Sequence, residues 1–182
     1  MNMRNTTERY GSVSITLHWL MLLVFVAVYA CIELRELFPK GSDPREALKT
    51  WHFMLGLSIF VLVWLRLLVN ITSPSPAIVP NPVKWQMRLA KLMHLALYVL
   101  MICMPLLGWL LLSASGKSIP FFGLELPALV GKNKALAELI KEIHETGGLV
   151  GYYLIGLHAS AALFHHYFVR DNTLRRMLPG QD

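Results

Sequence analysis

The sequence predicts an all-α protein, an integral membrane four-helix bundle that forms a single domain over residues 1–182. Two observations predict this class. First, 55% of the residues are hydrophobic and only 15% are charged, whereas a soluble domain is about one-quarter charged. Second, four apolar segments each approach the roughly 20 residues that a helix needs to cross the hydrocarbon core of a bilayer. The expected spans cover residues 13–32, 50–69, 89–112 and 143–169.

The ends and links of these segments fit membrane crossing. Tryptophans stand near segment ends, where aromatic rings favour the membrane–water interface; they are Trp51, Trp64, Trp85 and Trp109. The link after the second span is rich in proline, which predicts an extended chain. The link after the third span, residues 113–142, is the longest. Within it, Lys134–Glu145 is expected to be helical and to extend the fourth helix out of the membrane.

The distribution of charge gives an orientation. An even number of spans places both termini on one side of the membrane. That side carries nine of the 17 Lys and Arg residues but three of the 11 acidic residues, a net charge of +6, and the opposite side sums to zero. The link between the second and third spans is basic and contains no acid. The count of Lys and Arg, nine against eight, hardly distinguishes the two sides. The expectation that both termini are cytoplasmic therefore rests on the basic link.

Histidines inside the apolar segments are the main functional signal. His144 and His158 lie fourteen residues apart on the fourth segment, so in a helix both face one side, about 21 Å apart along the axis. The alternating helix directions place His52 at the level of His144 and His18 at the level of His158. Intramembrane imidazoles are costly and need a partner. Because histidines on facing helices suit the two axial positions of a haem iron, the sequence predicts two haem sites.

The residues leave other roles open. Zinc prefers three or four ligands close together, often with a carboxylate or thiolate, and no acid lies near the deep histidines. A proton relay would use Asp or Glu in mid-membrane, and none of the predicted spans has one there. Hydrogen bonding between helices is the simplest alternative. Glycines interleave with the histidines of the fourth segment, where they make room for a porphyrin or let helices approach closely; they are Gly147, Gly148, Gly151 and Gly156.

Four further polar side chains are expected towards the terminal side. Arg66 lies fourteen residues after His52, on the same helix face, where it can pair with a haem propionate or extend to the interface. By spacing alone, His94 or His165 can replace a ligand of the nearer haem. Their expected role is to hydrogen-bond a quinone and supply its protons. His166 points about 100° away from His165 and is expected at the membrane interface.

Several short motifs, taken together, resemble those of a known family. They are Leu17-His18-Trp19, His144-Glu145-Thr146, Gly156-Leu157-His158-Ala159, Leu163-Phe164-His165-His166-Tyr167 and the tail Arg170–Met177. The pattern resembles the prokaryotic di-haem cytochrome b561 family, and within it the superoxide oxidases, over nearly the whole chain. The resemblance implies two haem b groups, one bound by His18 and His158 and the other by His52 and His144. It also implies a quinone site beside the cytoplasmic-side haem, with His165 as a contact.

The resemblance further implies an activity and a location. Superoxide oxidases take an electron from superoxide at the periplasmic face and pass it through the haems to ubiquinone, in a bacterial inner membrane. An anionic donor favours a positive funnel, yet the loops on that face sum to zero, so attraction depends on how Lys117, Lys132, Lys134 or Arg45 are placed.

Two other functions stay open from the sequence. One is a cytochrome b anchor that relays electrons between a dehydrogenase or hydrogenase partner and the quinone pool. The other is a haem-free structural or transport bundle. We expect membrane lipid and ubiquinone as partners, superoxide or a redox protein as donor, and no nucleic acid.

Overall fold

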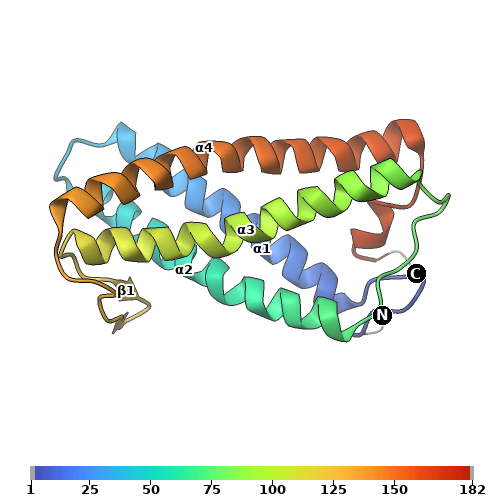
Figure 1. Cartoon of the computed structure of the whole chain (residues 1–182), viewed down its shortest axis with the longest axis horizontal. Coiled ribbons are helices and arrows are strands. Elements are labelled where there is room, and N and C mark those ends of the chain that lie inside the picture. Colours follow the sequence, from blue (N-terminus) through green and yellow to red (C-terminus); the bar gives the residue numbers. More distant parts are fainter. Residues whose placement is uncertain (1–2, 181–182) are drawn as a thin grey trace. The chain divides into compact units, whose positions relative to one another are not determined.

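The structure, a computed structural model, describes residues 3–180 and confirms the all-α class. Four long helices make up most of the chain (Figure 1); they are α1 (Ser12–Leu34), α2 (Asp43–Thr72), α3 (Lys84–Ala114) and α4 (Lys134–Phe164). Short 3₁₀- and π-helical turns complete the helical part, namely η1 (Arg35–Leu37), η2 (His165–Val169) and η3 (Arg175–Met177). By length and composition, four helical stretches can cross a membrane: Ser12–Leu37, Asp43–Thr72, Lys84–Ala114 and Lys134–Val169. These are the helices of the predicted membrane bundle.

The helices extend beyond the predicted spans into polar sequence. α4 begins at Lys134, which confirms that Lys134–Glu145 is helical and continues the fourth helix. Asn133 caps this helix, because its Oδ1 accepts a hydrogen bond from the backbone N–H of Leu136 at 3.0 Å. A helix satisfies its own backbone hydrogen bonds, so it can pass from water into lipid without a break.

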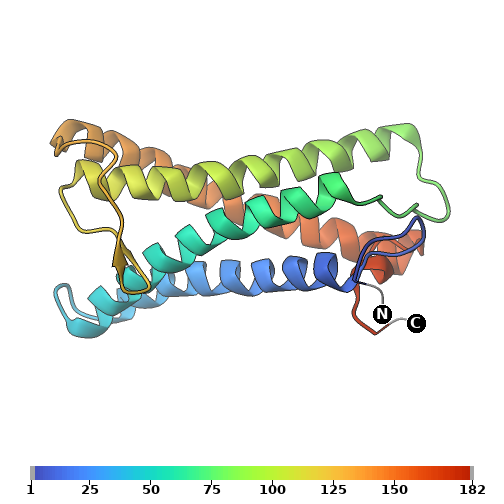
Figure 2. The same ribbon diagram turned by 90° about the horizontal axis from the view of Figure 1, so that it is seen from below.

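The link between α3 and α4 contains a hairpin that the sequence analysis did not predict. β1 (Pro120–Phe121) pairs with β2 (Leu124–Glu125) in antiparallel register (Figure 2). Ile119, next to this hairpin, is buried with Leu57 and Leu112 in one apolar cluster. Strands of two residues are too short to show an alternating pattern in the sequence. The apolar cluster, rather than local propensity, therefore holds this turn in place.

The chain divides into two compact units, and each contains a part of all four long helices. Unit 1 comprises Met1–Leu20, Val63–Val99 and Val150–Asp182, and unit 2 comprises Met21–Leu62 and Leu100–Leu149. The segments before α1 and after η2 therefore belong to the same unit, as an even number of spans requires.

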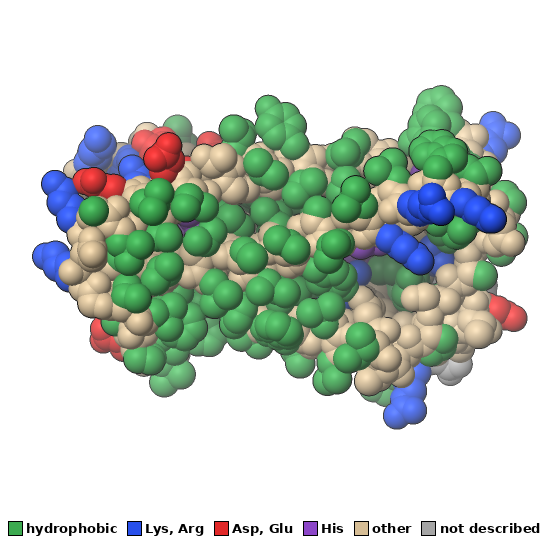
Figure 3. Space-filling view, viewed as in Figure 1, with side chains coloured by type: hydrophobic (Ala, Val, Ile, Leu, Met, Phe, Trp, Pro, Cys, Tyr) green, Lys and Arg blue, Asp and Glu red, His purple; other side chains and the backbone are tan. Residues whose placement is uncertain are grey.

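Much of the helix surface is apolar and exposed, as lipid contact requires. In the view of Figure 3, hydrophobic side chains cover the helices and charged side chains gather near the helix ends. Leu23, Leu68, Tyr153 and Leu157 are each more than half exposed. In water such a surface would drive aggregation, whereas in a bilayer it is the lipid-facing surface.

Polar contacts in unit 1 hold the two ends of the chain near α1. Asn5 is buried, and its Oδ1 accepts hydrogen bonds from the Gly11 N–H at 2.9 Å and the Ser14 hydroxyl at 2.7 Å. The indole N–H of Trp19 donates to the carbonyl of Met177 at 2.7 Å. The C-terminal tail is thereby fixed beside the helix that carries His18.

Candidate haem-binding and quinone-binding residues

Unit 2 brings His52 of α2 and His144 of α4 together. Their ring centroids are 6.2 Å apart, and the ring planes are inclined by 76°. Imidazole nitrogens bind a first-row metal at about 2.0–2.1 Å, and each ring atom lies about 1.15 Å from its centroid. Two rings bound in line to one metal therefore have centroids about 6.3–6.5 Å apart. The observed spacing fits an iron between these histidines.

The second nitrogen of His52 is already engaged. Its Nδ1 lies 3.0 Å from the main-chain carbonyl oxygen of Val28 on α1. A carbonyl only accepts hydrogen bonds, so Nδ1 carries the proton and donates it. In the neutral ring, Nε2 then has a free lone pair, which is the form that binds a metal.

Open space adjoins this pair. A Cβ placed on Gly56 or Gly148 would meet no neighbouring atom within 4 Å, and these glycines lie four residues after His52 and His144. Four residues are about one helical turn, so each space lies on the histidine-bearing face. Elsewhere the helices pack closely, since a Cβ on Gly147 would lie 2.5 Å from the sulfur of Met104. The residues present therefore fit a haem at this place.

Unit 1 holds a second pair, His18 of α1 and His158 of α4. Their centroids are 6.3 Å apart and their planes are inclined by 68°, which again matches two ligands in line. His94 of α3 also contacts His158, at 5.6 Å. This spacing is shorter than in-line ligation gives, and His94 is an exposed residue. The geometry thus favours His18 over His94 as the partner of His158.

Arg66 of α2 lies near this histidine cluster. Its guanidinium acts electrostatically on His18, His94 and His158. Uncompensated, a cation beside three imidazoles inside a membrane span is costly. An anionic group such as a haem propionate would remove that cost, because guanidinium–carboxylate pairs form short charge-assisted hydrogen bonds.

His165 takes a different partner. Its Nδ1 lies 2.5 Å from Oδ2 of Asp171, whose side chain is fully buried. Burial acts to raise the pKa of Asp171, but hydrogen bonds from His165 and Thr173 outweigh burial and hold the pKa below its usual value. The Nδ1 of His166 is buried and has no hydrogen-bond partner among residues 3–180.

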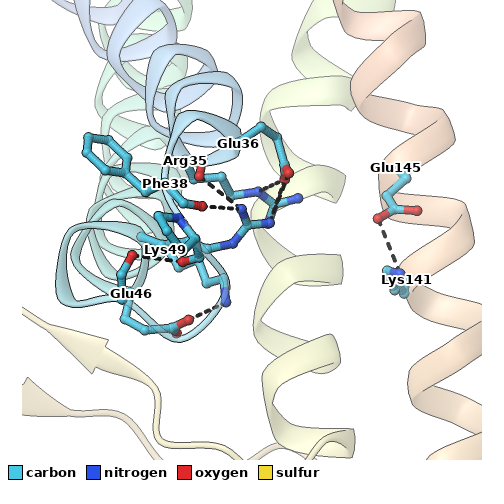
Figure 4. Close-up of polar contacts among 10 residues, drawn as sticks. Arg35, Glu36, Phe38, Glu46, Lys49, Lys141 and Glu145 are labelled. Atoms are coloured by element: carbon cyan, nitrogen blue, oxygen red, sulfur yellow. Dashed lines mark hydrogen bonds and ion pairs between the residues drawn. The ribbon is translucent and has the colours of Figure 1, made fainter.

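Cations in the loops of unit 2 are mostly paired with acids. Arg45 is buried and donates to the carbonyls of Arg35 and Phe38 and to the carboxylate of Glu36, at 2.9–3.0 Å. Figure 4 labels the three acceptor residues. Arg45 therefore closes the turn between α1 and α2 and is not available to a ligand. Figure 4 also shows Lys141 paired with Glu145 at 3.6 Å.

A cavity of 340 Å³ lies between the end of α3 and the start of α4. Its lining includes three lysines and one acid; the lining residues are Leu111, Ala114, Ser115, Lys132, Lys134, Ala137, Glu138 and Lys141. Along α4, Lys141 comes three residues before His144. Along α3, Leu111 comes three residues after Gly108, where a Cβ would lie 3.4 Å from Cε1 of His144. The cavity therefore begins about one helical turn from His144 along α4, and about one turn from Gly108, the neighbour of His144, along α3.

Comparison with known proteins decides the family. A family model described as prokaryotic cytochrome b561 matches residues 9–180. The chain belongs to the prokaryotic cytochrome b561 family. It is 45% identical over 172 residues to cytochrome b561 homolog 1 of Escherichia coli strain K12, covering 94% of this chain and 98% of the relative.

Other members of the cytochrome b561 family are also similar to the chain. The probable superoxide oxidase CybB of Yersinia pestis is 39% identical over 172 residues, covering 94% of this chain and 97% of the relative. Cytochrome b561 homolog 2 of Escherichia coli strain K12 is 29% identical over 179 residues, covering 98% and 95%. The protein is therefore a multi-pass membrane electron-transfer protein of an oxidoreductase family that binds b-type haem.

The structure shows two contacts of the candidate site histidines that the sequence did not predict. Asp171 belongs to the tail motif, but nothing in its spacing indicated a contact with His165, because the π-helical turn η2 changes the helical register. Val28 contributes only a backbone carbonyl, which carries no sequence signal at all. Among residues 3–180, no three His, Cys, Asp or Glu side chains converge as metal ligands.

Proposed function

We propose that the chain is a di-haem cytochrome b that oxidises superoxide at the periplasmic face of the bacterial inner membrane and reduces ubiquinone near the opposite face. The observation that carries this proposal is the pairing of four histidines, two in each unit, at ring spacings of 6.2 and 6.3 Å. One pair per unit supports two haems per chain. When bound, these groups would supply one-electron transfer between the two faces.

The overall reaction balances as a two-electron process. Two superoxide anions give up one electron each and become dioxygen, and one ubiquinone takes up both electrons and two protons to become ubiquinol. Two histidines would hold each haem, and the groups would supply electron transfer without direct binding of either substrate to the metal. The protein's residues therefore attract the anion at one face and supply protons at the other.

The cavity beside His144 supports the choice of an anionic donor. Lys132, Lys134 and Lys141 line it, together with Glu138. Lys134 pairs with Glu138 at 3.8 Å and Lys141 with Glu145 at 3.6 Å, which leaves an excess of one positive charge. Although the loops of this face sum to zero, the local excess of cations raises the concentration of a small anion there. The relative named a probable superoxide oxidase, 39% identical over nearly the whole chain, supports the same choice.

Residues of unit 1 support quinone reduction. His165 has a side chain 21% exposed and a buried carboxylate partner, so it can exchange protons with a ligand. His94 is a second exposed imidazole, beside His158. We assign Arg66 to a haem propionate because its charge acts on three histidines and no ion pair joins it to a carboxylate of residues 3–180.

The test begins with protein purified in detergent after growth with ample haem. A reduced-minus-oxidised visible spectrum with haem quantified per chain should give two b-type haems. Superoxide generated enzymatically should then reduce the haems, and added ubiquinone should reoxidise them with formation of ubiquinol. Absence of haem would overturn every redox assignment made for the protein.

A second outcome tests the superoxide assignment separately from haem binding. Two haems that superoxide does not reduce would refute the superoxide assignment alone. Purification of a stoichiometric dehydrogenase or hydrogenase with the chain would then identify the protein as a membrane anchor of that enzyme.

A further inference from the structure

The chain reverses sharply after α4 and returns onto His165. The π-helical turn η2 (His165–Val169) begins at this histidine, and Arg170 adopts a left-handed conformation with φ 59°. The backbone N–H groups of Arg170 and Asp171 both point to the carbonyl of His165, the latter at 3.3 Å. A non-glycine residue at positive φ is uncommon and costs energy, so the reversal is held by the contacts it makes.

One of those contacts joins two titratable side chains. Asp171 Oδ2 accepts a hydrogen bond from Nδ1 of His165 at 2.5 Å, and Oδ1 accepts one from the N–H of Thr173 at 2.8 Å. The carboxyl side chain is 0% exposed. A buried carboxylate is stable only when its oxygens are paired, and this one has a partner on each oxygen.

The pair determines which nitrogen of His165 is available. An ionised carboxylate only accepts hydrogen bonds, so the proton of the neutral ring is on Nδ1. Nε2 is then the nitrogen that a ligand meets, and it makes no hydrogen bond within residues 3–180. If the ring takes up a second proton, Asp171 supplies the counter-charge in a place shielded from water.

A separate set of contacts holds the tail that carries Asp171. Asn172 Oδ1 accepts from the N–H of Val79 at 2.8 Å, and the N–H of Asn172 donates to the Val79 carbonyl at 3.1 Å. Its side-chain amide also donates to the carbonyl of Ala77 at 3.3 Å. Arg176 also donates a hydrogen bond from its guanidinium to the carbonyl of Pro76 in the same link. The side-chain bonds of Asn172 can be removed without altering the carboxylate of Asp171.

We propose that Asp171 is the positioning residue of the proton donor to quinone: it holds His165 with Nε2 directed at the ligand and balances the charge of the protonated ring. This inference rests on the proposed function, in which a quinone is reduced beside His165. Before the step, the ring takes up a second proton on Nε2 from water at the terminal face. In the step itself, this Nε2–H bond breaks and its electron pair stays on nitrogen. The proton forms an O–H bond on the quinone oxygen. The quinone takes its electrons, one at a time, from the reduced protein. Water on the terminal face then reprotonates the ring.

The decisive comparison uses two variants at adjacent positions. Asp171→Asn keeps the size of the side chain but removes the charge. Asn172→Ala removes the side-chain hydrogen bonds from the tail to Val79 and Ala77 but keeps the charge. Quinone reduction by pre-reduced protein should be slowed about 100-fold or more in Asp171→Asn, the range typical of a lost general acid, with a similar quinone KM. Asn172→Ala should stay within a few-fold of the unaltered protein. Equal effects of the two variants would show that Asp171 serves only to attach the tail.

A spectroscopic measurement does not depend on turnover. Ring ¹⁵N NMR of the unaltered protein, with the His165 signals identified by their loss in His165→Gln, should show the Nδ1–H form of the neutral ring. Asp171→Asn should move the population towards the Nε2–H form, whereas Asn172→Ala should not. An Nε2–H ring in the unaltered protein would overturn the proposal even if Asp171→Asn fails to fold. Conversely, the expected NMR result without any quinone reduction would refute the proposed function and leave the His165–Asp171 pair intact.

Discussion

His52 donates its Nδ1 hydrogen to the main-chain carbonyl of Val28 at 3.0 Å, and this single bond orients the ring towards His144. No side-chain substitution at Val28 removes that carbonyl. The acceptor is part of the backbone of α1, inside unit 2, so the orientation of His52 is built into the contact between α1 and α2. Bonds of this kind to the second ring nitrogen fix the tautomer of metal-binding histidines.

Loss of a single histidine should remove one haem and leave the other. His52→Ala or His144→Ala should lower the haem content from two per chain to one, because each pair lies within its own unit. His94→Ala is the matched control and should retain two, since its 5.6 Å spacing to His158 does not fit in-line ligation. The ratio of haem to protein, measured in each variant, tests both expectations. Loss of a haem in His94→Ala would mean that His94, and not His18, is the partner of His158.

Filling the space beside the unit 2 histidines should exclude haem by size. Gly148→Leu should reduce the haem content while the helical content stays unchanged, because the leucine occupies room that the porphyrin needs. Gly156→Leu is the control: its position also has no neighbour within 4 Å, but Gly156 is exposed. Full haem content in Gly148→Leu would show that the open space does not belong to the haem site. Circular dichroism and the haem spectrum together make the measurement.

The lysines of the cavity should speed the reaction with superoxide. Replacing Lys132, Lys134 and Lys141 by glutamine should lower the second-order rate constant about tenfold at low ionic strength, and salt should reduce the difference. The control replaces three cations of unit 1, Lys84, Arg88 and Lys91, and should leave the rate unchanged. Rapid-mixing measurements of haem reduction at several salt concentrations test this. An equal loss in both triple variants would reflect net charge and not the cavity.

Arg45 should matter for stability rather than for the reaction with superoxide. Arg45→Gln removes a buried guanidinium and its bonds to the carbonyls of Arg35 and Phe38, which should cost about 2 kcal/mol of unfolding free energy. Lys49→Gln is the control, because the Lys49–Glu46 pair is exposed and should contribute little. Thermal unfolding in detergent compares the two variants. A slower superoxide reaction in Arg45→Gln with unaltered stability would contradict this role.

The His165–Asp171 pair should make the C-terminal tail sensitive to acid. The pKa of Asp171 is held below its unfolded value of 3.8, so the pair stabilises the tail fully above that value. This contribution is lost as the pH falls through the lower pKa of the folded state. Hydrogen exchange of residues 171–177 should therefore accelerate as the pH is lowered below about 4, after correction for intrinsic exchange. In Asp171→Asn the corrected exchange should be faster and should not vary over the same range.

The sequence by itself determined the number and approximate position of the helices. Twenty apolar residues can cross a bilayer only as a helix, because lipid offers no partner to backbone polar groups. The fourteen-residue spacing from His144 to His158 likewise follows from helical geometry alone. The level of each histidine follows from the direction of its helix. Hence the pairings of His52 with His144 and of His18 with His158 were predicted before any contact was known.

Only the tertiary structure decided which side chains meet across helices. Periodicity gives the face of a helix on which His94 lies, but not its distance from His158, because that depends on how neighbouring helices are rotated. The contact of His165 with Asp171 depends on a π-helical turn and a left-handed residue, and neither has a reliable sequence signal. Arginine is usually exposed, yet the turn between α1 and α2 buries Arg45. Such contacts arise from packing, which a one-dimensional pattern does not contain.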